Sequence, residues 1–235
     1  MNPFQTLNRG LLIACLGISL AAFGGEQAAE ASLRNRVRGT VSVMGKPVAD
    51  ASVTLWTTRG GQTPEQVKAV RSKKDGSFAL SVKPKNGTVH YLIASGGTVN
   101  NSNVDRLTML TVLDGTERGT AVINERTTVG SVWPNAQQLE GDQLIGSTNA
   151  LAIGSGHVKH LVDQRTGQFG ETLLNGFNLL SSETAARINV LSDLLALCGD
   201  PTKERGCTQL FQLTGATNSL DAMTNIAKLP WKNSG

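Results

Sequence analysis

The sequence predicts an α+β fold in two parts, an antiparallel β-sandwich followed by a mainly α-helical domain. Apolar and polar residues alternate from Arg36 to Val82 and on to about residue 113, and Gly-containing turns interrupt the alternation. Helical spacing replaces this alternation in the second half. Two cysteines lie at the facing ends of two of the expected helices. We therefore predict a signal peptide at 1–31, the sandwich at 32–115 and the helical domain at 116–235.

Six short strands are expected in the first part. They lie near 36–43, 51–58, 66–72, 77–83, 89–95 and 106–113. An Asp-Gly pair at 75–76 and an Asn-Gly pair at 86–87 supply the positive φ angles that tight hairpins require. Short strands at this spacing indicate a sandwich, and a barrel is the alternative.

A longer motif runs through these strands. It consists of Gly39-x-Val41, Gly45-x-Pro47-Val48-x-x-Ala51-x-Val53-x-Leu55 and Asp75-Gly76-x-Phe78-x-Leu80. Over about residues 34–96 this pattern resembles the carboxypeptidase regulatory-like domain. The resemblance implies a transthyretin-like (prealbumin-like) β-sandwich. It implies no catalytic residue, because in the peptidases that carry such a domain catalysis belongs to a separate domain.

The clearest helix is expected at 182–198. Ser182 suits its N-cap, Glu183 complements the N-terminal dipole, and Gly199 with Pro201 ends it. Further helices are expected at 207–213 and 219–229. Residues 147–162 mix helical spacing with glycines, and 125–138 show no sustained pattern.

The helical half carries a second resemblance, to a segment of bacterial secreted proteins that follows such sandwiches and often precedes a β-propeller. The residues that carry it are Asn124-Glu125-Arg126-Thr127-Thr128-Val129, His160-Leu161-Val162-Asp163, Asn189-x-Leu191-x-x-Leu194 and Cys207-x-x-Leu210-Phe211. Any activity that such a propeller houses is not assigned to this chain.

The N-terminus has the pattern of a signal peptide. Arg9 precedes the apolar stretch 10–23, and Ala29 to Ala31 forms an A-x-A cleavage site, with an earlier one at 22–24. The protein is therefore expected to be exported, to the periplasm or the extracellular space, with no stable transmembrane segment after cleavage. Two alternatives stay open: a buried N-terminal helix, and lipidation at Cys15, where 12–15 resembles a lipoprotein box but the apolar stretch continues past the cysteine.

Cys198 and Cys207 remain after cleavage. An isolated pair this close in an oxidising compartment predicts a disulfide. A zinc site would need further ligands nearby, and the sequence offers none there. No cofactor is expected.

The charge and aromatic content limit the class of partner. The 22 basic and 18 acidic residues become 21 and 16, a formal charge of +5, once Arg9, Glu26 and Glu30 are removed. This balance in an exported protein argues against nucleic acid. Aromatic residues make up only 4% of the chain, which is few for a stacking platform. We expect an envelope polymer or a protein as partner.

One cluster could bind a metal. His157, His160 and Asp163 follow at intervals of three, which places them on one helical face where they could hold a divalent cation. The alternative is a solvated histidine pair, with Asp163 in the turn before Gly167. Ser155 with His157 and Asp163 could form a triad only through tertiary geometry, since the G-x-S-x-G context is absent. No catalytic residue is assigned.

Two functional hypotheses follow. The first is a non-enzymatic exported protein of a bacterial cell envelope, used for binding, adhesion or assembly. The alternative is an enzyme, or an accessory subunit of one, that acts on envelope polymers or peptides at a site between the two halves.

Overall fold

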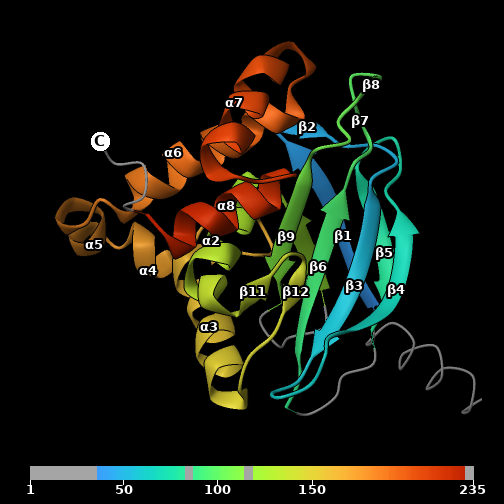
Figure 1. Cartoon of the computed structure of the whole chain (residues 1–235). Coiled ribbons are helices and arrows are strands. Elements are labelled where there is room, and N and C mark those ends of the chain that lie inside the picture. The colour runs from blue at the N-terminus through green and yellow to red at the C-terminus, as the bar shows by residue number, and fades with distance from the viewer. Residues whose placement is uncertain (1–35, 83–86, 114–118, 231–235) are drawn as a thin grey trace, which may run out of the picture. The chain divides into compact units, whose positions relative to one another are not determined.

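The computed structural model describes residues 36–82, 87–113 and 119–230, so the expected signal peptide and the lipidation alternative lie outside it. The described chain is a mixed α+β structure with two four-stranded sheets (Figure 1). By their contacts, residues 35–235 group into one unit. The division at residue 115 stays a prediction.

The first sheet is built around β1 (Arg36–Val43). It pairs antiparallel with β5 (Ser77–Ser81) and with the short β2 (Lys46–Pro47), and parallel with β10 (Gly119–Ile123). The predicted alternation is present, because every second residue of β1 from residue 37 to residue 43 is buried. The parallel strand β10 lies beyond the expected strands and was not predicted.

The second sheet is antiparallel throughout, in the order β4-β3-β6-β9. Its strands are β4 (Glu65–Arg71), β3 (Ser52–Thr58), β6 (Val89–Ser95) and β9 (Thr108–Val112). One edge, β4, is mostly exposed, whereas all five residues of the other edge, β9, are buried. Buried residues of both sheets and of the helices form one hydrophobic cluster. Three two-stranded hairpins complete the strands: β7 (Thr98–Val99) with β8 (Ser102–Asn103), β11 (Leu139–Glu140) with β12 (Gln143–Leu144), and β13 (Val162–Asp163) with β14 (Gln168–Phe169).

Seven α-helices lie within the described residues. They are α2 (Glu125–Asn135), α3 (Thr148–Leu161), α4 (Glu171–Leu174), α5 (Gly176–Ser181), α6 (Thr184–Ala196), α7 (Glu204–Thr214) and α8 (Ser219–Lys228). Figure 1 shows them gathered on the side of β9, away from β4 and β5. The expected helices at 182–198, 207–213 and 219–229 are confirmed. The expected cap is wrong: Glu183 is the N-cap of α6, and the hydroxyl of Ser182 instead donates to the carbonyl of Asn178, in the preceding helix.

Helix α2 was not predicted, because its buried face is polar. It begins with a capping box in which the Asn124 side chain accepts from the Thr127 amide while the Thr127 hydroxyl accepts from the Asn124 amide. Seven of its eleven residues are buried, and four of these are Thr, Ser or Asn. A hydrophobic stripe is the main helical signal in a sequence, and α2 lacks one.

The hydroxyl groups of α2 and α8 cover the backbone of the buried edge strand. The amides of β9 that point away from β6 donate to side chains: Thr108 to Ser219 at 2.8 Å, Leu110 to Thr128 at 3.1 Å and Val112 to Ser131 at 3.0 Å. The Ser219 hydroxyl in turn donates to the Thr108 carbonyl at 2.7 Å. Buried amides need an acceptor, so these side chains take the place of a further strand.

The predicted disulfide is confirmed. Cys198 lies in the 3-10 turn that follows α6, and Cys207 lies in α7, with 4.9 Å between their Cα atoms. It joins two consecutive helices, as the sequence predicts. Among the described residues, no helix has the length and apolarity to cross a bilayer.

The start of α2 also meets the β1–β2 turn, and this contact predicts a pH dependence. Glu125 accepts a hydrogen bond from the Met44 amide, and burial raises the pKa of its carboxyl above the ordinary 4.5. Because the folded-state pKa is raised, folding is favoured most below pH 4.5, and that stabilisation is lost as pH rises through the folded-state value.

Glu125→Gln is therefore expected to stabilise the protein at neutral pH and to have no effect at pH 4. The amide oxygen can still accept from Met44 but never ionises. Urea midpoints at pH 4 and pH 7 measure the difference. Glu65→Gln, on the exposed strand β4, controls for the loss of a negative charge. Parallel stability curves for Glu125→Gln and the wild type would contradict the prediction.

Candidate functional site

The predicted metal residues do not form a metal centre. His157 and His160 lie on α3, as expected, but Asp163 lies in β13, beyond the helix. The two imidazole rings are 6.3 Å apart, and each has another partner. The Nδ1 atom of His157 is 2.8 Å from the Ile153 carbonyl, and that of His160 is 2.9 Å from the Thr172 hydroxyl.

Asp163 is used locally in the β13–β14 turn. Its carboxylate accepts from the Arg165 amide at 2.8 Å and from the Thr166 hydroxyl at 3.0 Å. Within the described ranges, no three His, Cys, Asp or Glu side chains meet in a group that could hold a metal ion. The helical spacing was correct for the histidines, but the helix ends before the aspartate.

Ser155 has the geometry of a helix residue. Its hydroxyl donates to the Leu151 carbonyl, four residues earlier, at 2.6 Å, while the ring of His157 bonds to the carbonyl of Ile153. Serine hydroxyls inside helices commonly make this bond to the preceding turn. A nucleophile would need its hydroxyl bonded to a base, so the three residues do not form a triad.

The seam between the second sheet and α3 contains a pocket of about 280 Å³. Its polar lining includes Thr58, Ser155 and Lys159, and the Thr58 hydroxyl donates to the Leu144 carbonyl at 2.7 Å. Where β6 meets β12, burial raises the pKa of Tyr91 to about 12, and its hydroxyl accepts from the Leu144 amide at 3.2 Å. Tyr91 therefore stays protonated at neutral pH.

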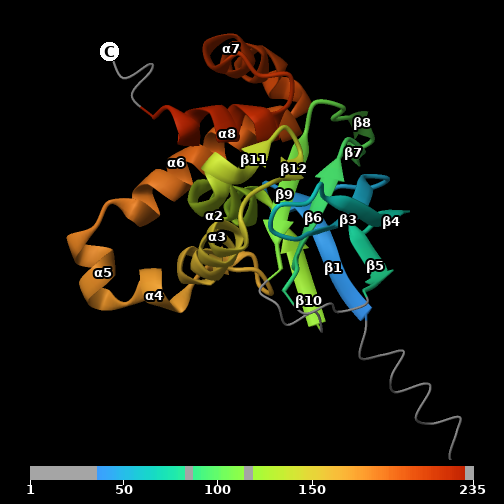
Figure 2. The same ribbon diagram turned by 60° about the horizontal axis from the view of Figure 1, so that its bottom comes forward.

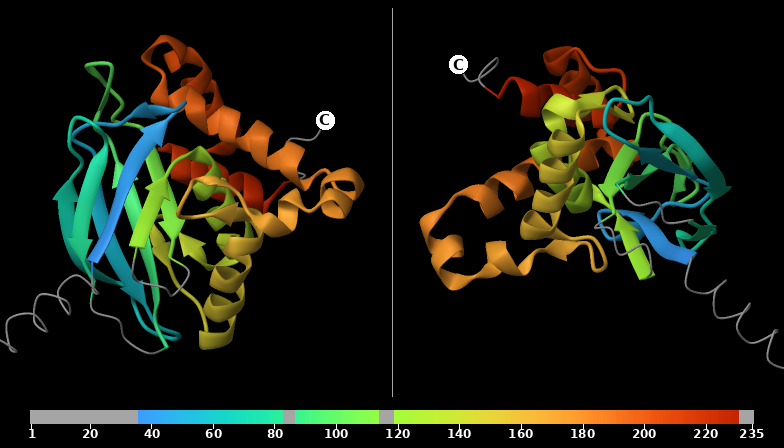
Figure 3. Two further views of the ribbon diagram at one scale, coloured as in Figure 1. Left: turned by 180° about the vertical axis from the view of Figure 1, so that it is seen from behind. Right: turned by 90° about the horizontal axis from the view of Figure 1, so that it is seen from below.

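A different feature stands out in the helical layer. We call residues 171–182, which comprise α4 and α5, the arm. Figures 2 and 3 show it extending from the layer on the side away from the sheets. Its base is fixed: Leu173 is buried, Thr172 bonds to His160, and Asn178 donates to the Thr172 carbonyl at 2.8 Å.

The arm presents large apolar side chains to solvent, and residues 176–182, which contain α5, form its tip. No residue of α5 is buried; Phe177 is 77% exposed and Leu180 is 90% exposed. Leu174 and Leu179 are about half exposed, at 51% and 46%. A surface helix normally turns such residues toward the core, and exposed apolar side chains that gather in one place mark an interaction site.

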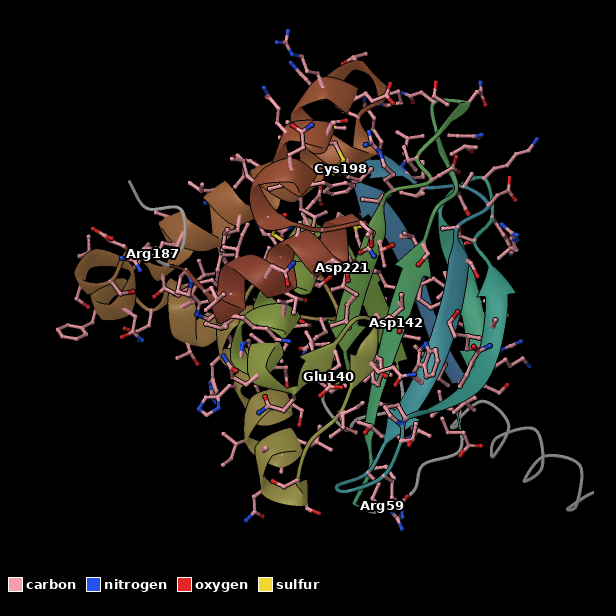
Figure 4. The ribbon with its side chains drawn as sticks, viewed as in Figure 1. Arg59, Glu140, Asp142, Arg187, Cys198 and Asp221 are labelled. Carbon is pink, nitrogen blue, oxygen red and sulfur yellow. A yellow bond between two sulfur atoms is a disulfide. The ribbon has the colours of Figure 1, made fainter. Side chains whose placement is uncertain are left out.

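A pocket of about 480 Å³ begins where the arm ends, and we call it the arm pocket. It is lined by Trp133, Leu161, Ser181, Glu183, Thr184, Arg187, Ile188 and Leu191. The lining thus combines apolar side chains with two charged ones. Arg187 and Glu183 form an ion pair of 3.0 Å, and Figure 4 shows Arg187 beside the arm.

The sequence pattern missed this surface because a short helix leaves no periodic signal. Residues 170–182 contain two Gly residues and an Asn-Gly step, which divide the apolar residues into pieces shorter than two helical turns. The sequence did carry one signal of an exposed apolar surface. Several large apolar residues lie between helix-breaking residues, in segments too short to form an element that could bury them.

No protein-family model and no curated protein matches this chain. Among solved structures, one match is a 9R-lipoxygenase from Cyanothece PCC8801, at 14% identity and a TM-score of 0.22. The match covers 33% of this chain and 16% of the lipoxygenase chain. A likeness this low carries no argument about fold or activity. The chain is thus an α+β protein whose candidate site is the arm with its pocket.

Proposed function

We propose that this chain is a non-enzymatic exported protein of a bacterial cell envelope, or a secreted one, that works as a binding or assembly module. Its contact surface is the arm together with the arm pocket. The two sheets serve as a scaffold of the transthyretin-like sandwich kind, as the resemblance over residues 34–96 implies, and the helical part presents the arm.

One observation carries the proposal: the arm exposes Phe177 at 77% and Leu180 at 90% while its base is anchored. Burying a large apolar side chain contributes roughly 1.5–3 kcal/mol, and a free arm forgoes that contribution for each of them. A partner that covers the arm recovers it. Such a surface suits a protein that works in contact with another molecule.

Two further features support export. The pattern at 1–31 is that of a signal peptide, and the Cys198–Cys207 disulfide fits an oxidising compartment. The enzyme alternative relied on His157, His160 and Asp163 at the seam, and these side chains are engaged separately. An enzymatic site would have to lie in the pocket between the second sheet and α3, which we call the seam pocket.

The test compares capture from envelope extract by immobilised 32–235 protein and by the double variant Phe177→Ser/Leu180→Ser. We expect the variant to bind its partner at least about 100-fold more weakly, because two apolar side chains no longer leave water. Quantitative binding isotherms against the captured component measure this. The free energy of unfolding should hardly change, since both residues are exposed.

Ile153→Ser provides the matched control. Ile153 is 61% exposed on α3 and lines neither the arm pocket nor the seam pocket, so the same loss of apolar surface should leave capture intact. Equal capture by the wild type and the arm variant would refute the arm as the contact surface.

A further inference from the structure

We propose that the partner of the arm is a second copy of this chain, with α5 of each copy seated in the arm pocket of the other around a two-fold axis. This inference rests on the proposed function, since it identifies the partner of the same surface. It requires a self-complementary surface, because a two-fold interface brings the same patch of both subunits together.

The arm and the pocket are neighbours on that patch. Residues three and four apart share a helical face, so Phe177, Leu180 and Ser181 lie on one face of α5. Ser181 lines the arm pocket, so the exposed apolar residues border the pocket opening. This arrangement allows a two-fold contact. The arm of one copy enters the arm pocket of the second copy, and the arm of the second copy enters the arm pocket of the first.

The chemistry of projection and depression also matches. The tip at 176–182 contains no charged residue. The pocket presents Trp133, Leu161 and Leu191 among its lining, and Trp133 is 40% exposed, which is large for an indole beside a hydrophobic core. Seating the tip there buries apolar surface on both sides without burying a charge on the arm.

The charged residues of the pocket argue for a second copy over a lipid surface or a strongly charged partner. They are one acid, Glu183, and one base, Arg187, whose side chains are 80% and 69% exposed. As an exposed pair at the start of α6 they contribute little to stability. A two-fold axis that passes between Glu183 and Arg187 brings each of them to its opposite on the other copy. An anionic membrane would instead need an excess of basic residues around the arm.

The test is sedimentation velocity of the 32–235 protein over a range of concentrations. We expect the wild type and Ile153→Ser to form a dimer, and Phe177→Ser/Leu180→Ser to be a monomer. Glu183→Arg and Arg187→Glu alone should each weaken the dimer about tenfold or more, because like charges then meet across the axis. An equimolar mixture of these two variants should restore the dimer. One copy then carries arginine at both positions and the other carries glutamate at both, so opposite charges meet. A merely misfolded variant would not be rescued by mixing.

Three results would overturn the inference: a wild-type monomer up to concentrations on the order of 100 μM, an open series of oligomers in place of a dimer, or no restoration in the mixture. A monomer that floats with lipid vesicles through its arm would also overturn it. If the wild type is monomeric but still captures an envelope component through Phe177 and Leu180, the proposed function stands and only the second copy is excluded.

Discussion

Replacing Thr128 with valine and Ser131 with alanine is expected to lower the free energy of unfolding by about 2–6 kcal/mol. Each substitution removes the hydrogen-bond acceptor of a buried β9 amide, that of Leu110 or that of Val112. Thr128 and Ser131 are fully buried, so water cannot take their place. A buried donor left without a partner costs about 1–3 kcal/mol, and there are two of them.

Urea unfolding followed by circular dichroism measures this loss as a lower midpoint. Hydrogen exchange should accelerate most at the amides of Leu110 and Val112. Thr111→Val is the matched control on the same strand, because the Thr111 hydroxyl is buried and has no hydrogen-bond partner among the described residues. That variant should be as stable as the wild type or more so. If Thr111→Val is destabilised as much as the double variant is per replaced side chain, the loss reflects packing and the hydrogen-bond explanation fails.

Removing the disulfide by Cys198→Ser/Cys207→Ser is expected to cost about 2.5–3 kcal/mol, the chain-entropy value for closing a loop of this length. The cysteines are nine positions apart and both are buried. Other contacts hold α7 in place: Arg106 donates to the Thr208 hydroxyl at 3.0 Å, and its guanidinium lies 5.4 Å from the ring centre of Phe211. The helix should therefore stay folded but become less stable.

Urea midpoints with and without a reductant check this second prediction. The wild type should shift toward the variant when reduced, and the variant itself should not respond to the reductant. Thiol titration of the denatured, unreduced 32–235 protein should find no free thiol. Two free thiols per chain would contradict the bond, and equal stability with and without it would contradict the energy.

Much of the fold followed from local patterns. The alternation of apolar residues predicted β1, β3, β4, β5, β6 and β9 to within two residues of their observed bounds. The apolar spacing predicted α6 and α8 similarly well, and the isolated cysteine pair predicted the disulfide. These signals are carried by residues close together in the chain, and burial of one face is enough to produce them.

The arrangement of those elements depended on contacts between distant residues. Strand β10 pairs parallel with β1 across about 80 positions, and nothing in its five residues specifies that partner. The close approach depends on Gly39, where a Cβ atom would lie 1.9 Å from the Ala121 carbonyl oxygen. The polar face of α2 is explained by its contact with β9, because the buried amides of that strand need hydrogen-bond acceptors.

The candidate site shows the same division. The sequence determined that His157 and His160 share a helix, that the cysteines pair, and that apolar residues gather between 173 and 180. Only the tertiary structure decided that Asp163 turns away from the histidines and that Phe177 and Leu180 face solvent. The physical reason is that hydrophobicity is a property of a residue, whereas burial depends on which elements the folded chain packs around it.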